Sequence, residues 1–326
     1  CFNPLYKMVK LYDNIPLVDL SMMDGDVASK KQFAKMLGEA YENFGFVAVI
    51  NHGLSDEIQD KLYTLWKDFY ASDMQEKLKL ALPENQYQRG YTPPQSEQAV
   101  GHDVPDEKEF YHVGQPDEVI DGGGYNYLRN VWPENKPELK ELSLDAFKIL
   151  ENSAAKMLRG IAIYLDLDEN YFQDKVIGGN SILRPIHYYP VDPDKVDEDA
   201  MRAAEHGDIN FITLLMGASA GGLQVLRADG KWIDITVVPD ALVCNVGDML
   251  DRLTNHKLKS TLHRVIMPPK EEMHKPRYSM PFFMHAKSDV NLECLPNCVD
   301  ADNPKRYEDT TVGEFLTERL AQIMKK

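Results

Sequence analysis

Seven short β-rich runs lie between residues 181 and 285, and this pattern limits the fold more than any other feature of the chain. Each run is bounded by turn signals, such as the Asp229 and Gly230 pair or the Pro239 and Asp240 pair. Strands this short and this frequent favour a β-sandwich or a double-sheet barrel with helices packed outside it. The runs are SILRPIHYYPV, INFITLLM, LQVL, KWIDITVV, ALVCNVGDML, STLHRVIM and RYSMPFFMH.

The sequence before these runs alternates between helical and extended patterns. Strands are predicted at 15–20 and 46–53, with a helix at 29–45 between them and a second helix capped by Ser55 after them. A long apolar stripe over 138–167 predicts an extended helix. The sequence therefore predicts an α/β elaboration in front of the β-rich core.

A segment from about residue 80 to 135 shows neither the helical nor the strand pattern of apolar residues and is rich in Gly, Pro, Tyr and Asn. Long irregular segments in compact proteins are usually functional or disordered, and the aromatic residues favour the first alternative. We expect loops that lie over the mouth of the barrel.

Charge and composition exclude several classes of function. The net charge of −16 repels nucleic acid and anionic membranes, so an acidic ligand would need a local cationic pocket. The chain shows no apolar run long enough to span a bilayer and no secretion signal, so a cytoplasmic location is expected. The four cysteines are scattered and are predicted to be reduced thiols: Cys1, Cys244, Cys294 and Cys298.

His206 and Asp208 stand two positions apart just before an apolar run, which is compatible with two ligands of one metal ion. Two histidines and one carboxylate on one face of the ion are the usual ligands of non-haem iron(II). An H-x-D pair alone is expected about once by chance in such a chain. The candidates for the third ligand are His256, His263, His274 and His285.

The local pattern favours His263 among these four. His256 and His274 lie in polar segments, where a solvated imidazole is the simpler interpretation, whereas His263 lies inside a predicted strand. Fourteen residues later, Arg277 and Ser279 share one face of another predicted strand. A guanidinium and a hydroxyl placed in this way can bind a carboxylate.

With H-x-D, a distant histidine and R-x-S in this order, the sequence resembles the iron(II)- and 2-oxoglutarate-dependent dioxygenases, and within them the isopenicillin N synthase-like branch. The segment FGFVAVINHG is similar to the N-terminal signature of that branch. LRPIHYYP and the stretch from GGLQVL to STLHRV are similar to the family's core. A further segment, KEFYHVG, resembles bacterial members.

The resemblance implies that iron(II) is bound by His206, Asp208 and His263. It implies that Arg277 and Ser279 bind the far carboxylate of 2-oxoglutarate, with O₂ as the second cosubstrate and ascorbate as an additional reductant. Tyr188 matches a tyrosine that helps to bind the same carboxylate. Plant members usually carry Asn at the place of Ile186, and this chain offers His187 instead.

The fold implied by the resemblance is mainly β, a double-stranded β-helix or distorted jelly roll with packed helices and an N-terminal α/β elaboration. We expect one catalytic unit over residues 1–326. It would consist of an N-terminal region with active-site loops (1–135), a long supporting helix (136–168), and a jelly-roll core with the metal site and a C-terminal helix (178–326).

The expected reaction is oxidation of a small-molecule substrate with release of succinate and CO₂, by hydroxylation, desaturation or cyclisation. Cationic and aromatic residues near the barrel mouth favour an acidic or amphipathic substrate, and a monomer is expected. The candidate substrate residues are Arg89, Tyr91, Lys108, Phe110 and Arg184.

Two alternatives to this function stay open from the sequence. The chain could be an iron(II) oxidase of the isopenicillin N synthase type, because such enzymes keep R-x-S for other carboxylates. It could also be a ligand sensor without catalytic activity on the same fold.

Overall fold

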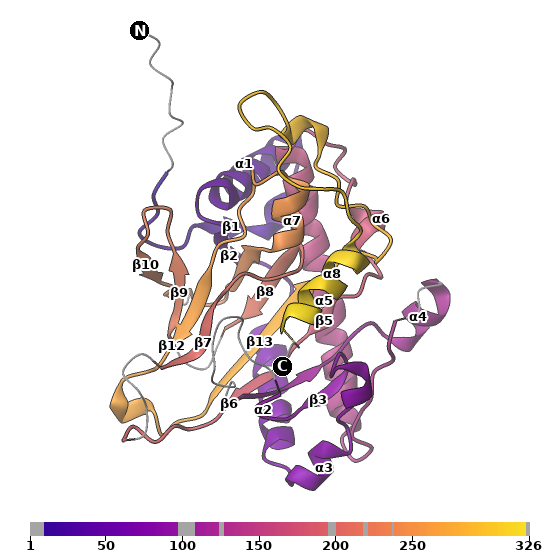
Figure 1. Cartoon of the computed structure of the whole chain (residues 1–326), viewed down its shortest axis with the longest axis vertical. Coiled ribbons are helices and arrows are strands. Elements are labelled where there is room, and N and C mark those ends of the chain that lie inside the picture. The colour runs from indigo at the N-terminus through magenta and orange to yellow at the C-terminus, as the bar shows by residue number, and fades with distance from the viewer. Residues whose placement is uncertain are drawn as a thin grey trace.

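Two β-sheets and the helices that pack around them make up the fold (Figure 1). The computed structural model describes residues 10–96, 108–123, 127–194, 200–217, 221–236 and 238–323. The larger sheet has nine strands, in the order β1-β2-β11-β8-β13-β6-β4-β3 with β5 paired to β13. The smaller has four, in the order β10-β9-β12-β7. This is the predicted jelly roll with packed helices.

The strands are short. They are β1 (Leu17–Asp19), β2 (Phe46–Ile50), β3 (Gly90–Thr92), β4 (Lys108–His112), β5 (Ile182–Leu183), β6 (Ile186–Tyr188), β7 (Met201–His206), β8 (Ile212–Met216), β9 (Leu223–Leu226), β10 (Trp232–Asp234), β11 (Leu242–Val246), β12 (His263–Ile266) and β13 (Arg277–Met284).

The helices precede the jelly roll or connect and follow its strands. They are α1 (Val27–Asn43), α2 (Asp56–Tyr70), α3 (Met74–Leu78), α4 (Asp117–Gly123), α5 (Pro137–Tyr164), α6 (Gln173–Val176), α7 (Asp248–Leu253) and α8 (Val312–Ile323). None of the helices in the described ranges is both long enough and apolar enough to cross a membrane.

Helix α5 joins the N-terminal elements to the large sheet. It packs against α1, α2, β8 and β13, and Phe147 meets Phe282 of β13 edge to face, with ring centroids 5.1 Å apart. Helix α2 is capped by Ser55, whose hydroxyl accepts a hydrogen bond from the Ile58 N–H, as predicted. These helices cover one side of the large sheet and leave its other side for the barrel interior (Figure 1).

Strict alternation along β4, β6 and β13 separates the two sides of the large sheet. Phe110, Ile186 and Tyr188 form a small cluster of their own on the inner side. Directly opposite Tyr188 and Ile186, across the β6 and β13 pair, stand Arg277 and Ser279. Because side chains alternate in a strand, neighbours such as Glu109 and Tyr111 face the helices instead.

The structure differs from the sequence prediction in three places. The segment around 80–135 contains β3, β4 and α4 and is therefore not wholly irregular. The run ALVCNVGDML becomes helical at Asp248. Strand β7 was not predicted, because MRAAEH lacks the β-branched residues of a typical strand and is held by its pairing with β12. The treatment of residues 1–326 as a single catalytic unit stays a prediction.

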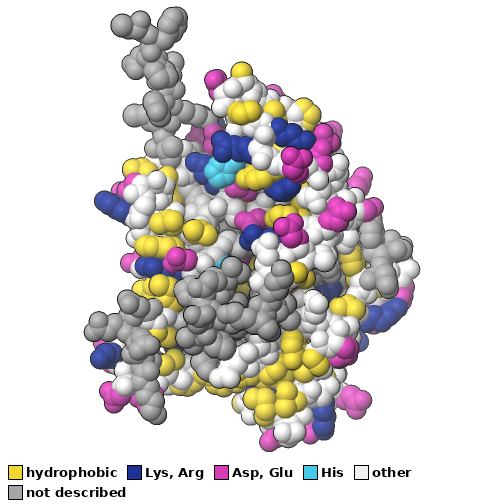
Figure 2. Space-filling view, viewed as in Figure 1, with side chains coloured by type: hydrophobic (Ala, Val, Ile, Leu, Met, Phe, Trp, Pro, Cys, Tyr) yellow, Lys and Arg dark blue, Asp and Glu magenta, His cyan; other side chains and the backbone are white. Residues whose placement is uncertain are grey.

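Acidic and basic side chains are interspersed on the face shown in Figure 2. Cys244, Cys294 and Cys298 are free and buried, in agreement with the predicted reduced thiols, whereas Cys1 lies outside the described residues.

A buried ionic network lies on the helix-facing side of β4. Glu109 is fully buried and accepts hydrogen bonds from Lys77 Nζ at 2.7 Å, from the Tyr91 hydroxyl and from His187 Nδ1 at 2.7 Å. Burial alone would raise the pKa of Glu109, but these donors outweigh it and lower that pKa. The network therefore fixes an ionised carboxylate behind the barrel wall.

Replacing Glu109 with alanine should lower the free energy of unfolding by about 3–5 kcal/mol, because Lys77 would keep a buried charge without its partner. Urea unfolding at neutral pH would measure the loss. Glu76→Ala is the matched control, since Glu76 pairs with Lys79 on the surface and its removal should change stability by no more than about 1 kcal/mol. Equal losses in the two variants would contradict a special role for the buried network.

Candidate metal centre

Three side chains from two adjoining strands converge at the mouth of the barrel. His206 is the last residue of β7, Asp208 follows two positions later, and His263 is the first residue of β12, directly opposite His206. One possible ligand atom from each lies within 4.8 Å of the other two. Asp208 Oδ1 is 4.0 Å from His206 Nε2 and 3.7 Å from His263 Nε2.

Hydrogen bonds to backbone carbonyls orient both imidazoles. His206 Nδ1 lies 2.7 Å from the Ala204 carbonyl, and His263 Nδ1 lies 3.3 Å from the Thr261 carbonyl. A carbonyl only accepts, so we assign the proton to Nδ1 in each ring, which leaves the Nε2 lone pairs directed at Asp208. His206 is open to solvent on one side, yet burial among protein atoms and the neighbouring His263 lower its pKa and favour the neutral ring that binds metals.

Asp208 is held by its second carboxylate oxygen. Oδ2 accepts hydrogen bonds from the Thr213 hydroxyl at 2.6 Å and from Asn245 Nδ2 at 2.8 Å. Burial would raise the pKa of Asp208, but the two histidines and these two donors outweigh it and lower that pKa. The carboxylate is therefore ionised, and Oδ1 is the oxygen that faces the imidazoles.

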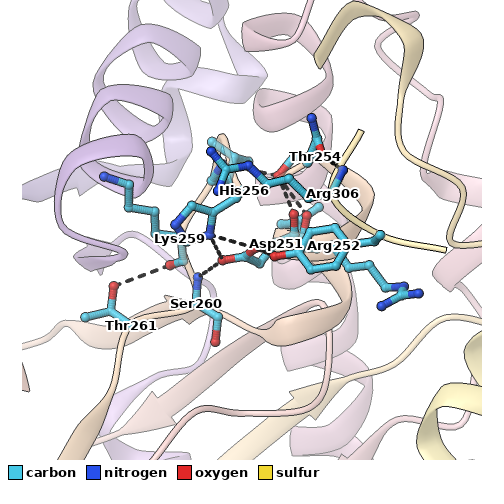
Figure 3. A network of polar contacts seen from close by, with 12 residues as sticks. Asp251, Arg252, Thr254, His256, Lys259, Ser260, Thr261 and Arg306 are labelled. Atoms are coloured by element: carbon cyan, nitrogen blue, oxygen red, sulfur yellow. Dashed lines mark hydrogen bonds and ion pairs between the residues drawn. The ribbon is translucent and has the colours of Figure 1, made fainter. Parts of the chain in front are cut away.

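The segment between α7 and β12 brings His263 to this place, and a polar network holds it (Figure 3). Asp251 accepts hydrogen bonds from the Ser260 N–H at 2.8 Å and the Tyr307 hydroxyl at 3.0 Å, and lies 2.9 Å from His256 Nδ1. Asn255 and His256 both have positive φ, which the surrounding contacts must enforce. The network fixes the chain directly before His263.

The N-terminal elaboration supports His263 as well. The Phe46 ring meets the His263 ring at a centroid distance of 5.4 Å, and the Thr261 hydroxyl donates to the Phe44 carbonyl at 3.0 Å. Gly45 has φ of +79°, and a Cβ there would lie 2.3 Å from Thr261 Oγ1. The close approach of these two segments therefore requires glycine.

The other three candidates for the third ligand lie elsewhere. His256 pairs with Asp251, and His274 is an exposed residue just after a short 3-10 turn. His285 is buried after β13, where burial and the charge of Arg89 lower its pKa to about 4. Among the described residues, His263 is the one of these four histidines that clusters with His206 and Asp208.

A buried arginine at the start of β13 has donor atoms without partners among the described residues. Arg277 is 2% exposed, and within the described part of the chain its Nε and Nη1 atoms have no hydrogen-bond acceptor. Its guanidinium lies over the Tyr188 ring at 5.1 Å, and Ser279 lies two residues further on the same face. Unpaired buried donors are costly, so this arrangement fits the carboxylate of a ligand. His187 points away to Glu109 and does not join this group.

The candidate substrate residues fall into two groups. Lys108 and Phe110 lie on the inner side of β4, and the Arg184 guanidinium is 4.5 Å from the Phe110 ring centroid. Tyr91 is fully buried with its hydroxyl on Glu109. Arg89 is also buried, and its guanidinium donates to the Gln88 carbonyl and to Asn180 Oδ1. These contacts favour structural roles for Tyr91 and Arg89.

Comparison with known proteins agrees with this geometry. A family model for the N-terminal region of non-haem dioxygenases in morphine synthesis matches residues 15–135, and a model of the 2OG-Fe(II) oxygenase superfamily matches residues 180–286. A 2-oxoglutarate-Fe(II) type oxidoreductase of Emericella nidulans is 32% identical over 92% of this chain and 88% of its own length. The chain belongs to the 2OG-Fe(II) oxygenase superfamily.

Solved structures support the same assignment. A 2OG-Fe(II) oxygenase family protein from Caulobacter crescentus is 40% identical, with a TM-score of 0.83 over 94% of this chain and 98% of that one. A full-length Neurospora crassa protein, solved in complex with alpha-KG and thymine, is 31% identical, with a TM-score of 0.84 over 94% of this chain and 96% of that one. As a member of this superfamily, the enzyme uses iron(II) as its metal and 2-oxoglutarate as its cosubstrate.

The sequence prediction missed the residues that hold Asp208 in this oxygenase. Thr213 belongs to an apolar run five residues after Asp208, and Asn245 belongs to the apolar run ALVCNV. A polar residue inside a fully buried strand requires a hydrogen-bond partner, and this was the available signal. The partner could be identified only from the pairing of β11 with β8.

Replacing Asn245 with alanine should weaken metal binding by about 10- to 100-fold, because Asp208 Oδ2 would lose the donor that orients the carboxylate. Anaerobic calorimetric titration of the metal-free protein with Fe(II) would measure this. Cys244→Ala is the control: Cys244 is the preceding residue of β11 and packs in the main core on the opposite face, so its loss should affect stability but not metal affinity. An unchanged affinity in Asn245→Ala would refute the orienting role.

Proposed function

We propose that His206, Asp208 and His263 hold the iron(II), and that Arg277, Ser279 and Tyr188 bind the far carboxylate of 2-oxoglutarate. The observation that carries the proposal is the cluster of two histidines and one carboxylate. The inner face of β13 also holds a buried guanidinium with two donor atoms that have no acceptor among the described residues. Iron(II) with 2-oxoglutarate and O₂ supplies an oxidant for an unactivated C–H bond of a small molecule, with succinate and CO₂ as products.

The protein contributes ligand geometry and charge. Asp208 brings one negative charge, which two hydrogen bonds hold in place, and the histidines bring neutral nitrogens whose Nδ1 protons are engaged. Arg277 supplies a fixed positive charge on the inner face of β13. The keto acid would therefore be oriented at one end by the metal and at the other by Arg277.

Replacing His206 with alanine should abolish succinate formation that depends on 2-oxoglutarate, because a metal ligand is lost. Replacing Arg277 with methionine should raise the KM for 2-oxoglutarate by about 10-fold or more and leave Fe(II) affinity near that of the unmodified protein. Succinate release, O₂ uptake and metal titration would separate the two effects.

The same measurements test the two alternative functions. An oxidase of the isopenicillin N synthase type would oxidise its substrate without releasing succinate, and such a result would refute the role of 2-oxoglutarate. A sensor would bind small molecules equally well after His206→Ala and consume no O₂ in either form. Membership of the isopenicillin N synthase-like branch, the monomeric state and the cytoplasmic location stay predictions.

We propose that the substrate is a small acidic or amphipathic molecule held by Arg184, Phe110 and Lys108. Arg184 Nε donates to His112 Nε2 at 2.6 Å, and the guanidinium lies 4.5 Å from the Phe110 centroid and 5.3 Å from that of Phe283. Burial lowers the pKa of His112 well below its usual value, so its Nε2 stays an acceptor. The thymine in the complex of the Neurospora crassa protein supports a small substrate.

Replacing Arg184 with glutamine should raise the KM for an acidic substrate by about 10-fold or more while the KM for 2-oxoglutarate stays unchanged. A panel of small carboxylates and their neutral amides, followed by succinate release, would show this difference. Arg264→Gln is the control, because Arg264 stacks on Trp232 at 4.0 Å and bonds Gln224 in the small sheet. An Arg184→Gln variant whose KM rises equally for the acids and for their amides would contradict the proposed contact.

A further inference from the structure

Strand β7 carries a buried arginine that the roles above do not use. Arg202 stands four residues before His206 on β7, in a stretch where the pairing with β12 shifts register twice. Arg202 is 7% exposed. Arginine is almost never buried to this extent unless it is paired.

The guanidinium of Arg202 lies next to the proposed carboxylate site. Its Nη2 donates to the Lys275 carbonyl at 3.2 Å, two residues before Arg277 on the adjoining stretch of chain. Burial and the positive charge of Arg277 lower the pKa of Arg202, while the Tyr188 hydroxyl acts in the opposite direction. Arg202, Arg277 and Tyr188 are therefore electrostatic neighbours.

The two guanidiniums together present three buried donors without acceptors. Among the described residues, Arg202 Nε has no hydrogen-bond partner, and the same holds for Nε and Nη1 of Arg277. Two like charges in a buried site repel each other, and an anion bound between them offsets that repulsion. The chain carries 52 acidic residues, yet the described contacts place none of their carboxylates on these three donors.

We propose that Arg202 binds the far carboxylate of 2-oxoglutarate together with Arg277, and that this second guanidinium makes the site selective for a dianionic keto acid. The proposal rests on the function proposed above. Ile186 is the residue opposite Ser279, and it offers no polar group to the ligand. Arg202 supplies, from the facing sheet, the donor that Ile186 lacks.

Binding of two keto acids to the Mn(II)-loaded full chain tests the proposal. One is 2-oxoglutarate, and the other is 2-oxovalerate, in which a methyl group replaces the far carboxylate. In Arg202→Met, which keeps the volume and removes the charge, the Kd for 2-oxoglutarate should rise about 10- to 100-fold. The Kd for 2-oxovalerate should stay within about twofold, because the metal end of the ligand is unaffected. Calorimetry without O₂ measures both.

Three reference variants show whether a change in the preference for 2-oxoglutarate is specific to Arg202. Arg277→Met should lose the same preference for 2-oxoglutarate, and Arg264→Met, on β12 with its head against Trp232, should keep it. Arg202→Lys keeps the charge but not the donor geometry, so it should retain an intermediate preference, and it serves as the test if Arg202→Met does not fold.

Two results would overturn the proposal. One is an Arg202 variant that binds 2-oxoglutarate as tightly as the unmodified protein. The other is a variant whose affinity falls equally for both keto acids, which would mean that Arg202 only supports the strand. If instead the unmodified protein does not prefer 2-oxoglutarate to 2-oxovalerate, the proposed function itself fails, and this is a distinguishable result.

Discussion

The geometry of the centre depends on the two carboxylate oxygens of Asp208, which have different neighbours. Thr213 and Asn245 hold Oδ2 from β8 and β11 of the large sheet, and Oδ1 is left facing two imidazoles of the small sheet. One carboxylate thereby joins the two sheets at the barrel mouth. Without those donors the side chain could rotate, and the three ligand atoms would no longer be fixed within 4.8 Å of one another.

His263 is held from a different direction. Asp251 fixes the segment before it, and Phe46 of the N-terminal elaboration packs against its ring. Helix α5 then ties that elaboration to β8 and β13, the strand that carries Arg277. The N-terminal elements are therefore part of the support of the candidate site, because they hold His263 and the strand that carries Arg277 in a single packed unit.

The sequence was sufficient to select the three side chains that cluster and to predict the layered fold, because both depend on local order: H-x-D, a strand histidine and short β-rich runs. It was insufficient wherever a role depends on pairing between strands. Tyr91 and Phe110 were equal candidates for substrate contact, yet Tyr91 hydrogen-bonds to Glu109 behind the barrel wall whereas Phe110 lies inside it. Strand β7 lacks a strand-like composition, so the position of Arg202 became visible only from its pairing with β12.

Neighbouring residues of one strand face opposite sides of the large sheet in this protein. A charged side chain therefore either stabilises the fold on the helix side or faces a ligand on the barrel side. Glu109 and His187 face the helices, where Lys77 and Tyr91 satisfy the carboxylate. Their neighbours on the same strands face the barrel, where the guanidiniums of Arg202 and Arg277 keep three donor atoms without acceptors among the described residues. A net charge of −16 thus says little about the ligand, because the charges that would meet it are few, buried and positive. An anion that enters the barrel can accept hydrogen bonds from the guanidinium donors that the fold leaves unpaired. A ligand without an anionic group cannot, and this difference in affinity gives the site its selectivity.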